Sequence, residues 1–273
     1  MEEREPSAYI AEFIGTLFLV FAIGMILSLH QATPQGLGYQ DFAVIGLLHV
    51  FVLAMIVATI GGASGAHVNP AVTVALLALR KIRGADAAIY VLLQLAGGVA
   101  GALLVRVLLQ DEGNAAHYGA TAVSPKFLSG NTGLGFLGEL IGTFMLMWAI
   151  MGTAVNPRAE RSWAPWIIGG TLGFAVMIFG PLTGAGFNPA RAFGPALVGD
   201  AWGGAGKWLL SYALAPIVGA LAAAYAYTAV VLVPQERLFG GPLVDPDVPP
   251  GRVPGEVESA VQAPGERPID KLS

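Results

Sequence analysis

The sequence predicts an all-α membrane protein with six transmembrane helices and two short re-entrant half-helices arranged as an inverted repeat. Three observations predict this fold. The composition is strongly apolar, six apolar segments have the length of a membrane span, and two Asn-Pro-Ala tripeptides occupy matching places in the two halves of the chain. Together they indicate that the chain crosses the bilayer an even number of times and places polar helix starts inside it.

The composition indicates that lipid is the main solvent of this chain. Of its 273 residues, 55% are hydrophobic and 12% are charged, whereas a soluble domain carries about 25% charged residues. The net charge of −4 is small, so no nucleic-acid partner is expected. The absence of cysteine excludes disulfides, thiolate metal sites and cysteine nucleophiles, and we expect no cofactor.

Six segments are long enough to cross about 30 Å of hydrocarbon at about 1.5 Å per residue. They cover roughly residues 8–29, 42–62, 86–106, 135–155, 163–183 and 208–233. Because the residues before the first segment are acidic and Glu12 interrupts it, we interpret it as a retained span rather than a cleaved signal. Residues 1–7 are then a short N-terminus, and residues 8–233 form the membrane domain.

The charged loops predict the orientation. One set of short loops contains five basic residues: Arg80, Lys81, Arg83, Arg158 and Arg161. The opposite side has Lys126 and Lys207, with Arg106 at a helix end. The positive-inside rule therefore places both termini of this multi-pass protein in the cytoplasm, and we expect it in the cell membrane. Residues 234–273 are rich in Pro and charged residues without periodicity, which predicts a disordered cytoplasmic tail.

The two halves of the chain, residues 8–108 and 135–233, repeat the same landmarks. Each half opens with Glu-x-x-Gly-Thr, at Glu12 and at Glu139, and each then contains one Asn-Pro-Ala. Three spans per half is an odd number, so the second copy must enter the membrane inverted. Inverted repeats are common in membrane transport proteins, whose sites lie near the midplane.

The two Asn-Pro-Ala motifs are the strongest functional signal. They are Asn69, Pro70 and Ala71, and Asn188, Pro189 and Ala190, within apolar segments 66–79 and 187–199 that are too short to span. Asn is a good N-cap and Pro is favoured at the first helical position, so each motif starts a half-helix. Inversion brings the two positive helix ends together near the bilayer centre. One copy would indicate only a helix start, but two matched copies favour a pore that admits neutral molecules and opposes cations and protons.

Residues 64–73 (SGAHVNPAVT) and 183–191 (TGAGFNPAR) resemble the two signatures of the major intrinsic protein (aquaporin) family. The resemblance covers about residues 8–233 and includes Tyr90-x-x-x-Gln94-x-x-Gly97. It implies six spans and two half-helices, one pore per subunit and a homotetramer. It also implies a passive channel for water and small neutral solutes, which is not an enzyme.

The same resemblance places an aromatic/arginine filter at His49, Val176, Ala185 and Arg191. Arg191 could instead only clamp its loop, and His49 could be a packed interface residue. This set differs from the common water-selective pattern and is partly similar to tonoplast-type and nodulin-type members, which implies ammonia, hydrogen peroxide or urea beside water. A glycerol facilitator is the alternative, although glycerol-conducting members usually carry Asp and a basic residue where this chain has Ala192 and Ala196.

Glu12, Glu139 and His67 are three further polar residues within the membrane domain, and the two acids have two interpretations. In the family, acids such as Glu12 and Glu139 brace the half-helix loops, and the His67 side chain is expected to contact its own loop. The other interpretation is a proton relay through the two acids in a secondary transporter. A serine protease with Ser64 as nucleophile is excluded, because it needs a late histidine as base and none follows His117.

Overall fold

The computed structural model describes residues 4–33 and 37–239, and all regular elements in these ranges are helical. Six helical segments are long and apolar enough to cross a membrane. They are α1 (Pro6–Gln31), α2 (Asp41–Ser64), α4 (Gly84–Leu108), α7 (Thr132–Ile150) with η2 (Met151–Val155), η3 (Arg161–Trp163) with α8 (Ala164–Thr183), and α10 (Ala205–Trp208) continuing through η4 (Leu209–Leu214), α11 (Ala215–Tyr227) and η5 (Thr228–Leu232) into α12 (Val233–Phe239). The six predicted spans are therefore confirmed, each within a few residues of its expected bounds.

The helices pack as two equivalent halves. In the first half α1 packs against α2 and α4, and in the second α7 packs against α8 and α11. The halves join where α2 crosses α8, with Gly46 facing Gly173. A methyl group at Gly173 would overlap the carbonyl oxygen of Gly46, so only glycine permits this close approach.

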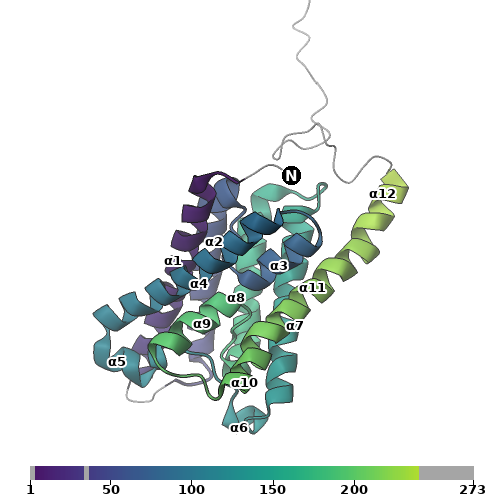
Figure 1. Ribbon diagram of the computed structural model, residues 1–273. Helices are drawn as coiled ribbons and strands as arrows, with labels where there is room; N and C mark the ends of the chain where they lie inside the picture. Colours follow the sequence, from purple (N-terminus) through teal and green to yellow (C-terminus); the bar gives the residue numbers. More distant parts are fainter. Residues whose placement is uncertain (1–3, 34–36, 240–273) are drawn as a thin grey trace, which may run out of the picture.

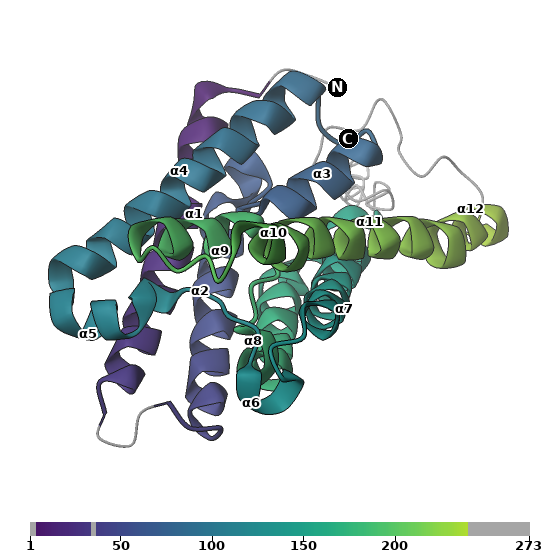
Figure 2. The ribbon, with the colours of Figure 1, turned by 60° about the horizontal axis from the view of Figure 1, so that its bottom comes forward.

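The two half-helices, α3 (Pro70–Ala78) and α9 (Pro189–Val198), enter the bundle from opposite faces. Figure 1 shows α3 in the upper part of the bundle, on the side where α1 begins, and α9 in the lower part. Figure 2 shows α3 beside α4 and α11, and α9 beside α4, in agreement with their contacts. Both helices start at the proline of the motif, so residues 66–69 and 187–188 are loop rather than helix. We call the side where α1 begins the N-terminal face.

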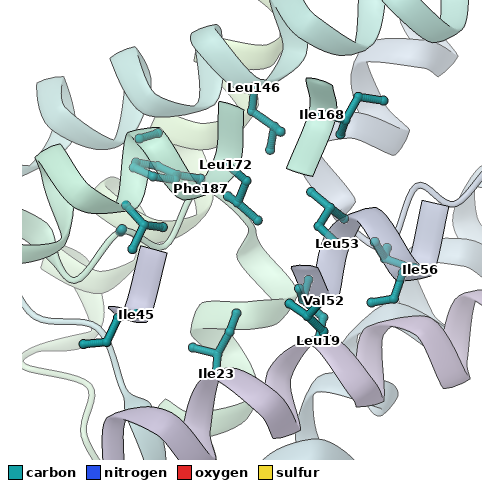
Figure 3. Close-up of a cluster of buried hydrophobic side chains, with 14 of the residues drawn as sticks. Leu19, Ile23, Ile45, Val52, Leu53, Ile56, Leu146, Ile168, Leu172 and Phe187 are labelled. Atoms are coloured by element: carbon teal, nitrogen blue, oxygen red, sulfur yellow. The ribbon is translucent and has the colours of Figure 1, made fainter. Parts of the chain in front are cut away.

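One apolar cluster joins the halves around the half-helix loops. Figure 3 shows Leu19 and Ile23 of α1, Ile45 and Val52 of α2, and Leu172 of α8 among its members. Phe187, which precedes the second Asn-Pro-Ala, is fully buried in the same cluster. The second loop is thus fixed by packing as well as by hydrogen bonds.

Three π-helical segments interrupt the spans, and each ends two residues before a proline. They are η2, η4 and η5, followed by Pro157, Pro216 and Pro234. Proline lacks an N–H and its ring clashes with the carbonyl four residues earlier, so the preceding turn widens. These widened turns were not predicted from the sequence.

Several short elements were also not predicted: α5 (Gln110–Ala115), η1 (His117–Gly119) and α6 (Pro125–Leu128). The last helix continues through α12 to Phe239, past residue 234, where the tail was expected to begin. The residues Gln235, Glu236, Arg237 and Leu238 are good helix formers, which permits this extension. The rest of the predicted tail, residues 240–273, lies outside the described residues.

Candidate functional site

The two motif asparagines cap their half-helices and bind each other's loops. Asn69 Oδ1 accepts the N–H of Ala71 at 2.9 Å, and Asn188 Oδ1 accepts that of Ala190 at 3.0 Å. With the oxygens turned to the caps, the amide nitrogens face the opposite loop. Asn69 Nδ2 donates to the Phe187 carbonyl at 2.9 Å, and Asn188 Nδ2 donates to the Val68 carbonyl at 2.7 Å.

These bonds place the two Asn-Pro-Ala motifs side by side in the interior of the bundle. Both asparagines are buried, with 3% and 5% of their surface exposed. An amide nitrogen carries two hydrogens, and within the described residues each of these nitrogens donates only one. One N–H of each asparagine is therefore free to bind a small molecule between the two helix starts.

The loops before both motifs contain left-handed backbone at residues other than glycine. After Gly65, Ala66 has a φ of 48° and Val68 a φ of 39°; after Gly184, Ala185 and Phe187 have φ values of 46° and 50°. Such conformations cost about 1–3 kcal/mol each and persist only where the surroundings fix them. Two buried carboxylates provide much of this fixation.

Glu12 holds the first loop. Its Oε1 accepts the hydroxyl of Ser64 at 2.7 Å and the N–H of His67 at 2.9 Å, and its Oε2 accepts the N–H of Val68 at 2.7 Å. Gln94 of α4 adds a fourth donor, at 2.8 Å from Oε2. In the sequence, Gln94 stands out only by its spacing from Tyr90 and Gly97, which predicts no role for it.

Glu139 holds the second loop in the same way. Its Oε1 accepts the Thr183 hydroxyl at 2.6 Å and the Gly186 N–H at 2.9 Å, and its Oε2 accepts the Phe187 N–H at 2.6 Å. Both glutamates are fully buried. A carboxylate whose oxygens accept several N–H and O–H hydrogen bonds is held in place as an acceptor. A proton relay would instead need a carboxyl group that repeatedly gains and loses a proton.

Two tyrosines and one histidine complete the loop framework. Tyr90 donates to the Ser64 carbonyl at 2.9 Å, and Tyr212 donates to the Thr183 carbonyl at 2.8 Å, at equivalent places in the two halves. The His67 ring lies edge-on to Tyr90, and its Nδ1 is 3.1 Å from Thr73 Oγ1. The His67 side chain therefore contacts the first turn of α3 and Tyr90 of α4.

The four residues expected at the filter are all buried. His49 comes from α2, Val176 from α8, Ala185 from the second loop and Arg191 from α9, and each has about 2% of its surface exposed. His49 Nδ1 lies 2.7 Å from the Ile45 carbonyl. Because a carbonyl only accepts, Nδ1 carries the hydrogen, and Nε2 of the neutral ring is an acceptor. No described residue bonds to this Nε2.

Arg191 is positioned by the loop that contains η1 (His117–Gly119), for which the sequence predicts no role. Its Nη1 donates to the Gly119 carbonyl at 2.8 Å, whereas its Nε has no partner among residues 4–33 and 37–239. Three successive left-handed residues in η1, His117, Tyr118 and Gly119, turn that carbonyl inward. Only the glycine at 119 hinted at such a turn.

The family comparison agrees with this geometry. A family model described as Major intrinsic protein matches residues 3–227. The chain belongs to the major intrinsic protein family. Aquaporin AqpM of Methanothermobacter thermautotrophicus is 38% identical over 242 residues, which cover 80% of this chain and 94% of that protein. Nodulin-26 of Glycine max is 37% identical over 221 residues, covering 81% and 76% of the two chains.

A solved structure confirms the fold. The X-ray structure of the aquaglyceroporin from Plasmodium falciparum superposes with a TM-score of 0.70 at 23% identity, covering 85% of this chain and 98% of that one. The predicted family and the aquaporin fold are thus confirmed. This major intrinsic protein is a passive membrane channel for water and small solutes, and the family consists of channels rather than enzymes.

Proposed function

We propose that this major intrinsic protein conducts water together with ammonia, hydrogen peroxide and urea, and excludes protons and ions. The observation that carries the proposal is the reciprocal bonding of Asn69 and Asn188, which fixes two amide donors beside two positive helix ends. A water oxygen that receives both free N–H groups has its hydrogens turned away from the site. That orientation interrupts the hydrogen-bonded chain along which protons move, and the helix ends oppose cations.

The filter residues support solutes beyond water. His49 Nε2 offers an acceptor and Arg191 offers donors, so a molecule that both donates and accepts can bind between them. Val176 and Ala185 add a medium-sized apolar side chain and a small one. Ammonia, hydrogen peroxide and urea each donate and accept hydrogen bonds and carry no charge.

The assembly and orientation belong to the same proposal. We infer a homotetramer with one pore per subunit in the cell membrane, and both termini in the cytoplasm. The orientation is supported by Arg80, Lys81, Arg83, Arg158 and Arg161, which occupy loops on the N-terminal face. Glu12, Glu139 and His67 are proposed as loop-bracing residues rather than as a proton relay.

The experiment is a flux panel on protein reconstituted into liposomes, with protein-free liposomes as baseline. Stopped-flow measurements and dye assays should show water, ammonia, hydrogen peroxide and urea above baseline. Val176→His adds a second bulky polar group, so hydrogen peroxide and urea flux should fall relative to water. Flux of water alone would contradict the proposed solutes, and glycerol flux matching that of water would favour a glycerol facilitator. Solute accumulation against its gradient, driven by protons or sodium, would instead indicate a transporter.

A further inference from the structure

A cavity of about 200 Å³ lies on the N-terminal face, at the end of α3 that is remote from Asn69. It is bordered by the end of α3 and by the two π-helical segments η2 and η5. Its lining is mostly apolar: Leu79, Lys81, Met151, Val155, Pro157, Thr228 and Leu232. Because α3 rises about 1.5 Å per residue, its far end is about 13 Å from the motif, and the lining contains none of the motif or filter residues.

The cavity lies beside an exposed apolar surface. Val230, within η5, has 66% of its surface exposed, and Leu238 of α12 has 76% exposed. Exposed aliphatic side chains on a spanning helix face acyl chains or a neighbouring subunit rather than water. Met151 and Val155 of η2 and Thr228 and Leu232 of η5 border the space between the two helices.

Lys81 provides a cation at the rim of this cavity. The chain leaves α3 through Arg80 in a left-handed conformation, φ 57°, and the Lys81 N–H closes the turn on the Leu76 carbonyl at 2.8 Å. Within the part of the chain that the structure describes, the Lys81 ammonium has no hydrogen bond or ion pair. Partial burial lowers the pKa of Lys81 from its ordinary value of 10.5, so an anion beside it would stabilise its charged form.

We propose that Lys81 and this cavity bind one anionic phospholipid from the leaflet on the N-terminal face. The lipid phosphate binds the Lys81 ammonium, and the part of an acyl chain nearest the head group packs against the apolar lining. A free phosphate would satisfy Lys81 but would leave the apolar lining uncovered. A zwitterionic lipid would fill the cavity but would bring a compensating positive charge. Basic pockets between helices at a membrane surface recognise anionic head groups in this manner, and Arg80 and Arg158 in the adjoining loops add positive field.

The test titrates the full-length protein in detergent with phosphatidylglycerol and with phosphatidylcholine of identical chains, and follows bound lipid by native mass spectrometry. We expect phosphatidylglycerol to bind about fivefold more tightly, the factor that one lysine near a membrane surface supplies. Lys81→Gln should remove this preference. Lys126→Gln, which removes the same charge from the opposite face, should retain it.

Two further measurements separate the lipid from a free anion and from a folding defect. Val155→Phe fills the cavity while keeping Lys81, so it should weaken binding of both lipids, and excess inorganic phosphate should not compete. Water flux and thermal stability of Lys81→Gln should match those of the unsubstituted protein. The proposal is overturned if the preference survives in Lys81→Gln, if Lys126→Gln abolishes it equally, or if inorganic phosphate displaces the lipid.

Discussion

The side-chain amide of Asn188 donates a 2.7 Å hydrogen bond to the backbone carbonyl of Val68, 120 residues earlier in the chain. The amide of Asn69 makes the equivalent bond to Phe187 across 118 residues. Each asparagine therefore starts one half-helix and fastens the loop of the other. Because both bonds cross between the repeats, the two amides proposed to select the permeating molecule also hold the two halves together.

Replacing Asn69 with alanine should lower stability and raise proton leakage together. The variant loses the cap on α3 and the bond to Phe187, which we expect to cost about 1–3 kcal/mol. Thermal unfolding and a pH-sensitive dye inside liposomes would measure the two effects. Asn131→Ala is the matched control, since Asn131 caps the exposed start of α7 and should cost about 1 kcal/mol without a leak. Equal leakage in both variants would contradict the role of Asn69.

Replacing Arg191 with alanine should widen the filter and weaken its discrimination. The change removes a buried guanidinium and leaves the Gly119 carbonyl without its donor at 2.8 Å. We expect flux of urea and glycerol to rise severalfold relative to water, and small cations to pass measurably, because the repelling charge is gone. Liposome swelling and cation flux measure this. Arg106→Ala, at the exposed end of α4, is the control, and an unchanged solute ranking in Arg191→Ala would refute the filter role.

The glutamine variants of Glu12 and Glu139 distinguish bracing from proton transfer. A glutamine amide nitrogen cannot accept, so at either position at least one N–H or O–H donor loses its acceptor in the interior. Each substitution should reduce the free energy of unfolding by about 1–3 kcal/mol. Water flux per folded channel should not depend on a proton gradient before or after the change. A variant of full stability that loses only proton-coupled flux would support the relay.

Mercurial sensitivity tests where Ala185 lies. The protein contains no cysteine, so mercurials should leave its water flux unchanged. In Ala185→Cys, a thiolate-bound mercury at the filter should reduce water flux strongly, and a thiol reagent should restore it. Ala85→Cys, exposed at the start of α4, is the control that should react without block. Labelling of Ala185→Cys without loss of flux would show that this residue lies outside the pore.

Several features of the site could not be found by reading the sequence. Gln94 reaches Glu12 only because α4 packs against α1, and Gly119 reaches Arg191 only because an irregular loop folds back over α9. Gln94 shares helical spacing with Tyr90 and Gly97, but that spacing does not identify a partner 82 residues away. Gly119 lies in a loop without periodicity, 72 residues from Arg191. The π turns were missed for a different reason, since proline in a span predicts a kink but not the form that relieves it.

The sequence by itself determined the membrane class, the six spans, the two helix starts and the family, because hydrophobic length, capping chemistry and motif spacing are local properties of the chain. The tertiary structure decided how the loops are held and which polar atoms remain free. Glu12, Glu139 and the two asparagines are buried acceptors and donors, and their partners are fixed by the packing of distant helices. Among the described residues, Nε2 of His49 and Nε of Arg191 have no hydrogen-bond partner, and this follows from that packing. A polar atom is available to a permeating molecule only where no neighbour already binds it.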